Sequence, residues 1–222
     1  MIEMLNKFNL ELACIIVEYG SGSKVLHFAK SHGCSGGTVV YGKGSVNGSI
    51  LCFLGLSEVR KEIIFIIADR HKIRYFLDAA SSEFKFDKQN HGIAFTTSIE
   101  NVLGTKYITC EDEENEDREE KIMYHVITSI VDKGKGEDVI SSASRAGSKG
   151  GTIINARGSG VHETSKVFSM EIEPEKEIVL ILSEADFTDK IVAAIREDLE
   201  IDKPGNGVIY VKNVNTTYGL FK

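Results

Sequence analysis

In residues 121–222, short apolar runs alternate with stretches in which apolar residues recur every three or four positions. Short runs rich in β-branched residues are typical of strands, and the longer spacing is typical of helices packed on a sheet. Strands are predicted at Val126–Val131, Thr152–Ala156, Glu177–Leu182 and Val208–Val211. Helices are predicted over Glu137–Ala146 and over the stripe Phe187, Ile191, Ala194, Ile195 and Leu199. This order, β-α-β-β-α-β, is the ferredoxin-like split βαβ arrangement.

Glycines mark the connections between these elements. Gly134-Lys135-Gly136 precedes the first helix, Gly147 is predicted to cap its end, and Pro204-Gly205-Asn206-Gly207 is predicted as a turn. Helix amides after Gly134-Lys135-Gly136 could hold an anion, but the third glycine of a dinucleotide fingerprint is absent. We therefore interpret that segment as a tight connection. The unbroken apolar character of Glu177–Leu182 predicts a central strand.

The first half of the chain repeats the second. Gly33–Thr38 matches Gly147–Thr152 at a spacing of 114 residues, and that spacing gives 12 identities over the 34 positions of Leu12–Ser45. After one extra residue, Lys61-Glu62-Ile63 matches Lys176-Glu177-Ile178 at a spacing of 115, which holds to Gly104 and Gly219. Such a repeat indicates one structural unit used twice. The predicted fold is α+β, with two tandem ferredoxin-like β-α-β-β-α-β domains, at residues 1–106 and 121–222.

Residues 107–120 carry the charge imbalance of the chain. They contain one basic and eight acidic residues, which equals the net charge of −7 for the whole sequence. A self-repelling run of this kind predicts an extended acidic linker between the domains. Neither half has the excess of Lys and Arg that binds phosphates along a duplex, so nucleic acid is not an expected partner.

Compartment and redox state follow from simpler features. The longest apolar runs are far shorter than the roughly 20 residues that span a bilayer, so no membrane insertion is expected. The first residues lack the pattern of a signal peptide, which predicts a cytoplasmic protein. The four cysteines have no disulfide or zinc-ligand spacing and are predicted to be reduced thiols.

Three segments carry a resemblance to a known family. Gly150–Gly160, Pro174–Leu182 and Asp202–Val211 together resemble the PII family of signal-transduction proteins. The resemblance covers nearly all of residues 121–220 and reaches the first half through the repeat. It implies a homotrimer that binds a small effector at clefts between subunits, ATP, ADP or AMP being the candidate nucleotides. It also implies a flexible loop that docks onto an enzyme, transporter or transcription regulator and thereby reports nitrogen, carbon or energy status to that partner. No enzyme activity, catalytic residue or metal is implied.

The same resemblance assigns the binding residues. Glycines let backbone N–H groups approach a phosphate, and successive amides in a tight turn form an anion site. By the resemblance the effector site is predicted at Thr152, Gly158, Gly160, Gly205, Asn206 and Gly207. Arg157 and His162 are added to the predicted site as nearby candidates to replace cations that the family has and this sequence lacks. The partner-docking loop, residues 159–168, is predicted to contact its partner through Glu163, Thr164, Ser165 and Lys166. The alternating Phe168, Met170 and Ile172 are predicted as a strand face.

The sequence also departs from the family pattern. Val208, Gly219 and Phe221 stand where the family has one Lys and two Arg that grip phosphates. Each such charged hydrogen bond contributes about 1.5–3 kcal/mol, so triphosphate binding in the family's manner should be much weaker. The docking loop lacks the tyrosine that some members modify. In the first half Val46 replaces the equivalent of Gly160, which predicts a scaffold or an altered pocket there.

Two other functions are compatible with the pattern. One is a structural or metal-responsive trimer like the CutA family, although His162, Glu163 and Cys52 would offer few metal ligands. The other is an enzyme, since this fold excludes no chemistry by itself. No nucleophile, base and orienting group occur together in the sequence, which favours the regulator.

Overall fold

A computed structural model of the chain describes residues 9–45, 58–88, 91–99, 102, 123–158, 165–167, 170–172 and 174–220. These residues form two units. The first unit comprises the described parts of 1–40, 61–122 and 213–222, and the second comprises the described parts of 41–60 and 123–212. The predicted acidic linker, residues 107–120, lies outside the described residues.

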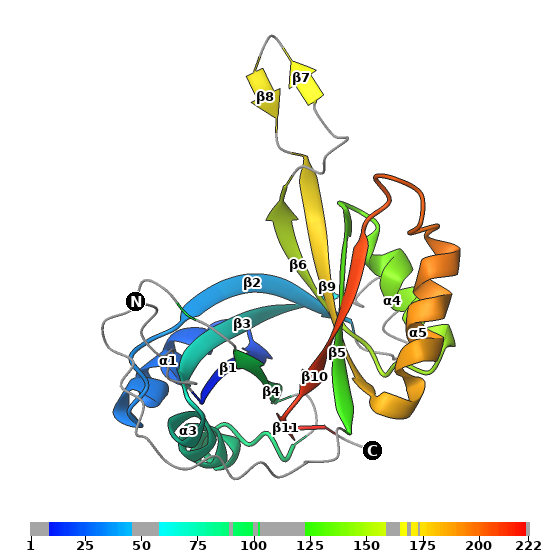
Figure 1. Ribbon diagram of the computed structural model, residues 1–222. Coiled ribbons are helices and arrows are strands. Elements are labelled where there is room, and N and C mark those ends of the chain that lie inside the picture. The colour runs from blue at the N-terminus through cyan, green and yellow to red at the C-terminus, as the bar shows by residue number, and fades with distance from the viewer. Residues whose placement is uncertain are drawn as a thin grey trace, which may run out of the picture. The chain divides into compact units, whose positions relative to one another are not determined.

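The first unit begins with strand β1 (Leu10–Glu18) and helix α1 (Gly22–Ser31), and its remaining elements follow in the predicted order (Figure 1). These are strand β2 (Thr38–Ser45), strand β3 (Glu58–Asp69), helix α3 (Arg70–Glu83) and strand β4 (Gly92–Ile99). The strand order is β2-β3-β1-β4, and a C-terminal strand β11 (Thr216–Tyr218) lies beside β4. Strand β1 pairs antiparallel with both β3 and β4.

The second unit repeats this plan. It contains strand β5 (Tyr124–Asp132), helix α4 (Gly136–Arg145), strand β6 (Thr152–Arg157), strand β9 (Glu175–Glu184), helix α5 (Ala185–Asp198) and strand β10 (Val208–Val214). The strand order is β10-β5-β9-β6, so the predicted central position of β9 is confirmed. Residues 42–44 of β2 belong to this unit and pair antiparallel with 152–154 of β6.

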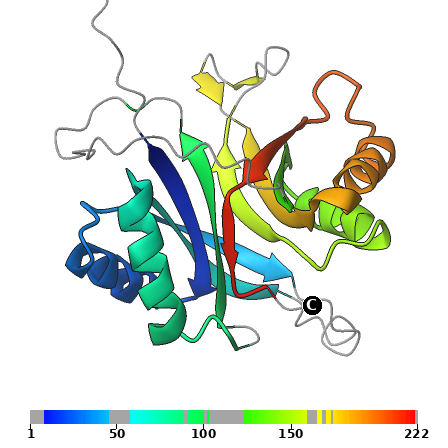
Figure 2. The ribbon, with the colours of Figure 1, turned by 60° about the horizontal axis from the view of Figure 1, so that its bottom comes forward.

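The helices of each unit cover one face of its strands (Figure 2). In both cores β-branched strand residues pack with apolar helix residues, and among the described residues only the first core also contains buried Phe side chains. In the first unit Ile15 and Ile64 meet Phe76 of α3, and in the second Ile127 and Ile181 meet Ile191 of α5; each of these side chains is at most 1% exposed. The predicted two-fold use of one β-α-β-β-α-β unit is therefore present in the structure.

Several details differ from the sequence-based predictions. Phe187, placed on the buried stripe of α5, is 44% exposed. Strand β10 continues three residues beyond the predicted Val211, and β11 was not predicted. In the predicted docking loop, β7 (Ser165–Val167) pairs with β8 (Met170–Ile172), which follows the loop, as a separate two-stranded ribbon. Each unit also includes a segment from the opposite half of the sequence.

The glycine after α4 behaves as predicted. Gly147 has φ of +108°, its N–H donates to the carbonyl of Ser144, and the N–H of Ser148 donates back to that of Ala143. This is the usual left-handed end of a helix, where glycine avoids the steric cost of a side chain. Among the described residues, no helix is both long and apolar enough to cross a membrane.

Candidate effector site

The predicted site residues of the second unit lie mostly at one end of its sheet. Arg157 ends β6 and lies opposite Glu175, the first residue of β9. Gly158 follows, and its N–H donates to the carbonyl of Pro174 at 3.1 Å. Gly207 directly precedes β10 and lies beside Ile130, near the end of β5. Because the strands are antiparallel, these positions lie at the same end of the sheet.

Thr152 lies away from that end of the sheet. It begins β6, is 5% exposed and stands in register with Leu180 of β9 and Gly44 of β2. Arg157 lies five positions farther along the same strand, which is about 17 Å of extended backbone. Thr152 and Arg157 therefore do not form one pocket within the second unit.

The 205–207 turn has clear structural duties. Gly205 and Gly207 have φ of +93° and +135°, and a Cβ on Gly207 would lie 2.5 Å from the carbonyl oxygen of Ile130. The side-chain Nδ2 of Asn206 donates to the carbonyls of Leu199 and Glu200, each at 3.1 Å, at the end of α5. The Asn206 amide nitrogen thus holds the turn against the helix. A ligand at the turn would therefore contact its backbone and not the Asn206 amide nitrogen.

Arg157 and the turn also lie on different strands. Strand β6 is three positions away from β10 in the order β10-β5-β9-β6, a lateral distance of about 14 Å. Within one unit the two groups therefore lie on separate strands, with β5 and β9 between them.

Charged pairs occupy the sheet end between them. Lys176 of β9 lies 2.5 Å from Asp132 of β5, and its side chain is only 12% exposed. Lys133 pairs with Glu175 at 2.6 Å on the surface. Sequence reasoning did not select Lys176, although it belongs to the repeated Lys-Glu-Ile motif. It is a half-buried cation on the strand that separates Arg157 from the turn.

In each unit a buried Glu side chain accepts a hydrogen bond from the N–H of the first residue of one helix. Glu177 of β9 accepts a hydrogen bond from the N–H of Gly136 at 2.7 Å, and Glu62 of β3 accepts one from Gly22 at 2.5 Å. Both glutamates are at most 9% exposed. A helix N-terminus favours a nearby negative charge, and here the carboxylates of Glu177 and Glu62 provide that charge. The structure thus agrees with the interpretation of Gly134-Lys135-Gly136 as a connection.

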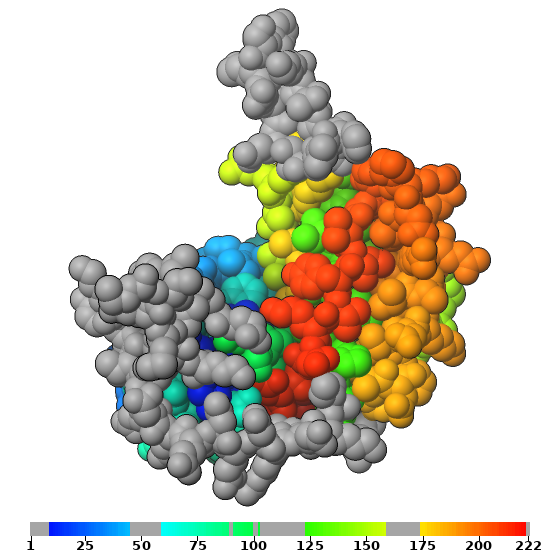
Figure 3. Space-filling view, viewed as in Figure 1, coloured from blue at the N-terminus to red at the C-terminus, as the bar shows by residue number. Residues whose placement is uncertain are grey.

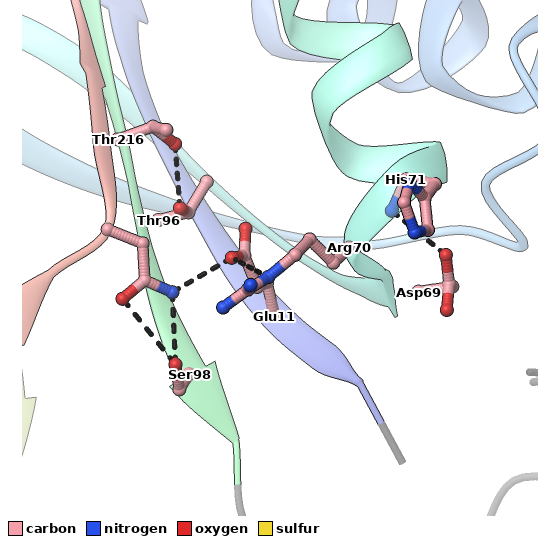
Figure 4. A network of polar contacts seen from close by, with 8 residues as sticks. Glu11, Asp69, Arg70, His71, Thr96, Ser98 and Thr216 are labelled. Atoms are coloured by element: carbon pink, nitrogen blue, oxygen red, sulfur yellow. Dashed lines mark hydrogen bonds and ion pairs between the residues drawn. The ribbon is translucent and has the colours of Figure 1, made fainter. Parts of the chain in front are cut away.

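The C-terminal segment is anchored in the first unit through a polar network (Figure 4). The Nδ2 of Asn215 donates to the Oε1 of Glu11 at 2.8 Å and to Ser98 at 3.0 Å. Arg70 donates to the same Glu11 oxygen at 2.9 Å, and Glu11 is fully buried. Residues 215–219, in the region that the resemblance assigns to phosphate contacts, here serve as a structural strap.

A groove with a volume of about 490 Å³ lies elsewhere in the second unit. Its walls hold four carboxylates and two basic groups, and its lining is Asp132, Lys135, Asp138, Ser141, Ser142, Arg145, Asp198, Leu199, Glu200 and Asn206. This excess of negative charge disfavours an anionic effector. Of the predicted site residues only Asn206 lines it.

Several predicted residues cannot be placed. Gly160, His162, Glu163 and Thr164 lie outside the described residues. The backbone of Ser165 and Lys166 lies in β7, opposite Ile172 and Glu171 of β8. Within the described ranges no group of three or more His, Cys, Asp or Glu side chains could hold a metal ion.

The comparisons with known proteins concern the second half of the chain. Residues 124–220 match the family model described as nitrogen regulatory protein P-II. The match covers this segment and not the first half. Among solved structures, the crystal structure of Arabidopsis thaliana PII bound to citrate matches with 22% identity, over 42% of this chain and 78% of that chain, at a TM-score of 0.34. No curated protein gives a significant match.

The P-II match corresponds to the second repeat. It runs from the first residue of β5 to just beyond β11 and therefore includes the β-α-β-β-α-β unit and the C-terminal strap. The first half is related to it by the internal repeat and by the shared order of elements.

Proposed function

We propose that this protein is a PII-like signal-transduction regulator that binds a small anionic effector, an adenine nucleotide or a metabolite, at clefts between subunits. The observation that carries the proposal is the P-II match over residues 124–220. The effector would control a partner protein, such as an enzyme or transporter, in nitrogen or carbon regulation. The proposed assembly is a homotrimer with a cytoplasmic location, acting as a regulator without enzyme activity.

The geometry of the sheet end supports a site shared between subunits. Arg157 lies on β6 and the 205–207 turn precedes β10, with two strands between them. A single unit therefore offers two half-sites, one cationic and one built from backbone amides. A cleft between neighbouring subunits would bring the half-site of one beside that of the next, as the family resemblance implies.

The chemistry of the half-sites favours an anion of modest charge. Arg157 is exposed, and a guanidinium binds carboxylate or phosphate through two parallel hydrogen bonds. The glycines of the turn leave backbone N–H groups open to close approach. Because Val208 and Gly219 replace family cations, we expect ADP, AMP or a carboxylate metabolite to bind in preference to a triphosphate.

Signalling would follow from a shift in population. An effector that contacts Arg157 and Gly158 binds at the base of the segment that carries the β7–β8 ribbon. Contacts that exist in only one arrangement of that segment favour that arrangement, and a partner that recognises it would bind or dissociate accordingly. Glu163 to Lys166 are the residues proposed to contact the partner.

Isothermal titration of the purified chain with ATP, ADP, AMP and 2-oxoglutarate tests the proposal. Arg157→Ala should weaken binding at least tenfold while the oligomer persists. Lys43→Ala is the matched control, because Lys43 is the repeat counterpart of Arg157 in the half predicted to lack an ordinary pocket. Equal affinities for wild type and Arg157→Ala would remove Arg157 from the site, and no binding of any effector would overturn the proposal.

A further inference from the structure

The groove of about 490 Å³ in the second unit lies against helix α4. Its lining residues on this helix are three or four positions apart and therefore share one helix face; they are Asp138, Ser141, Ser142 and Arg145. The end of α5 and the segment after it, orange in Figure 3, also line the groove. Only Asn206 belongs both to this lining and to the predicted effector site, so the proposed function leaves the groove unassigned.

The first unit fills the corresponding place with aromatic rings. By the repeat, Ser142 stands where the first unit has Phe28, and Leu199 stands where it has Phe84. The rings of Phe28 and Phe84 lie edge to face with their centroids 5.5 Å apart, and both pack against the core of the first unit. Ser142 is only 2% exposed, and its side chain is far smaller than a phenyl ring. The groove is therefore a local departure of the second unit from the plan that both units share.

The charges on the walls favour a cation. The carboxylates are Asp132, Asp138, Asp198 and Glu200, and the basic groups are Lys135 and Arg145. Asp198 is the last residue of α5 and Glu200 follows closely, so both lie at the negative end of the helix dipole. The hydrogen bond from Ser142, together with the charge of Arg145, lowers the pKa of Asp198. This carboxylate is therefore ionised at neutral pH.

The four carboxylates keep the capacity to accept a ligand. Each is paired with a Lys or Arg through one of its oxygens; the partners are Lys176 for Asp132, Lys135 for Asp138, Arg145 for Asp198 and Lys203 for Glu200. An ionised carboxylate has room for about four hydrogen bonds. The four acidic side chains are 40–59% exposed, and exposed ion pairs contribute little free energy, so a ligand can compete with them.

We propose that this groove binds a small organic cation, a molecule that carries an ammonium or guanidinium group. The cationic group would donate hydrogen bonds to Asp198 and to a neighbouring carboxylate, and the rest of the molecule would lie over Ser142. A volume of about 490 Å³ is in the range of roughly 300–1,000 Å³ that small-molecule sites have. This site goes beyond the proposed function, because its ligand has the opposite charge to the anionic effector.

Isothermal titration of the purified chain with putrescine, agmatine and spermidine tests the proposal. At least one of these three cations should bind saturably, and added salt should weaken the binding because the contacts are between exposed charges. Saturable binding by none of the three would overturn the proposal.

A charge substitution tests the assignment to the groove. Asp198→Asn keeps the shape of the side chain but removes its charge, and should weaken cation binding at least tenfold. Asp189→Asn is the matched control, because it makes the same substitution at an exposed position of the same helix outside the groove. Wild-type affinity in Asp198→Asn, or an equal loss in both variants, would contradict a site in this groove.

A filling substitution gives a second test. Ser142→Phe introduces the residue that the first unit carries at the corresponding position, and should abolish cation binding with the helical circular dichroism unchanged. A folded Ser142→Phe chain that binds the cation as the wild type does would overturn the proposal. If this variant does not fold, Asp198→Asn still decides the question.

The outcome is separable from that of the proposed function. Effector titrations of the same variants report the anion site, which should be unchanged in Ser142→Phe and Asp198→Asn because neither residue belongs to it. Cation binding without any effector binding would refute the proposed function alone. Effector binding without any cation binding would refute only the groove.

Discussion

Gly136→Ala should destabilise the second unit, because the added methyl would occupy space that a buried carboxylate already holds. The Cβ would lie 2.7 Å from the Oε2 of Glu177 and 3.0 Å from the Cδ1 of Ile153. That same Oε2 accepts the N–H of Gly136, so the carboxylate cannot move aside and keep its hydrogen bond. The backbone at Gly136 does not have positive φ, so alanine adds no strain of that kind.

The magnitude follows from three contributions. Alanine reduces the entropy of the unfolded chain and stabilises by about 0.5–1 kcal/mol. Loss of a charged hydrogen bond costs about 1.5–3 kcal/mol. Crowding of Ile153 in a packed core costs about 1–3 kcal/mol more. The net loss in the free energy of unfolding should be about 2–5 kcal/mol, which lowers the melting temperature of a chain of this size by about 5–15 °C.

Urea unfolding of a double-mutant cycle isolates the contact. Glu177→Ala removes the carboxylate, and Gly136→Ala should then cost much less than it does in the wild type. Gly22→Ala provides an independent replicate, because its Cβ would lie 2.7 Å from the Oε2 of Glu62 in the first unit. Gly158→Ala is the benign control, since no atom lies within 4 Å of its added Cβ.

Two results would refute this reasoning. One is a Gly136→Ala chain as stable as the Gly158→Ala control. The other is strict additivity in the cycle, with Gly136→Ala equally costly whether or not Glu177 is present. Either would mean that the carboxylate does not restrict this position to glycine.

Other side chains give further tests. Burial and the hydrogen bond to Asp78 raise the pKa of Tyr218 above its ordinary 10.0. The stabilisation that Tyr218 provides is therefore present below pH 10 and is lost as the pH rises beyond it. Urea titrations should show that Tyr218→Phe loses less free energy of unfolding at alkaline pH than the wild type does. Burial, opposed by the charge of Lys72, raises the pKa of the Cys34 thiol to about 11; iodoacetamide at pH 9 should label Cys34 far more slowly in the folded chain than in urea, by peptide mass mapping. Asn206→Ala loses both donors to the end of α5 and should lower the free energy of unfolding by about 1–2 kcal/mol, whereas an unchanged stability would show that the Asn206 amide does not hold the turn.

The repeat predicted the element order because it records local periodicity twice. Apolar spacing identifies β9 and α5. The unbroken apolar run of β9 favours a central position, because a strand that is apolar on both faces is most easily kept from water in the middle of a sheet. Phe187 fits the same helical spacing yet is 44% exposed, because spacing cannot show where the sheet ends beneath a helix. Local patterns therefore predict elements better than their contacts.

Contacts between residues far apart in the chain could not be predicted from the sequence. Gly136 and Glu177 each belong to a repeated motif, but nothing in either motif shows that one hydrogen-bonds the other. Strand β11 is three residues long and gains its partner from the other half of the chain, so no local periodicity marks it. For the candidate site, the glycine turn was predicted through the family resemblance, whereas Lys176 became visible only when β9 was placed between Arg157 and that turn.

The central claim is that the second unit, whose sequence matches the P-II model, senses a small anionic effector in an assembled protein. Native mass spectrometry of the purified chain, with and without ATP, ADP, AMP, cyclic AMP and 2-oxoglutarate, reports chain number and ligand number together. The account predicts three chains that carry up to three effector molecules, with binding lost in Arg157→Ala. Three chains that remain empty with every candidate, or a single chain at micromolar concentration, would contradict it.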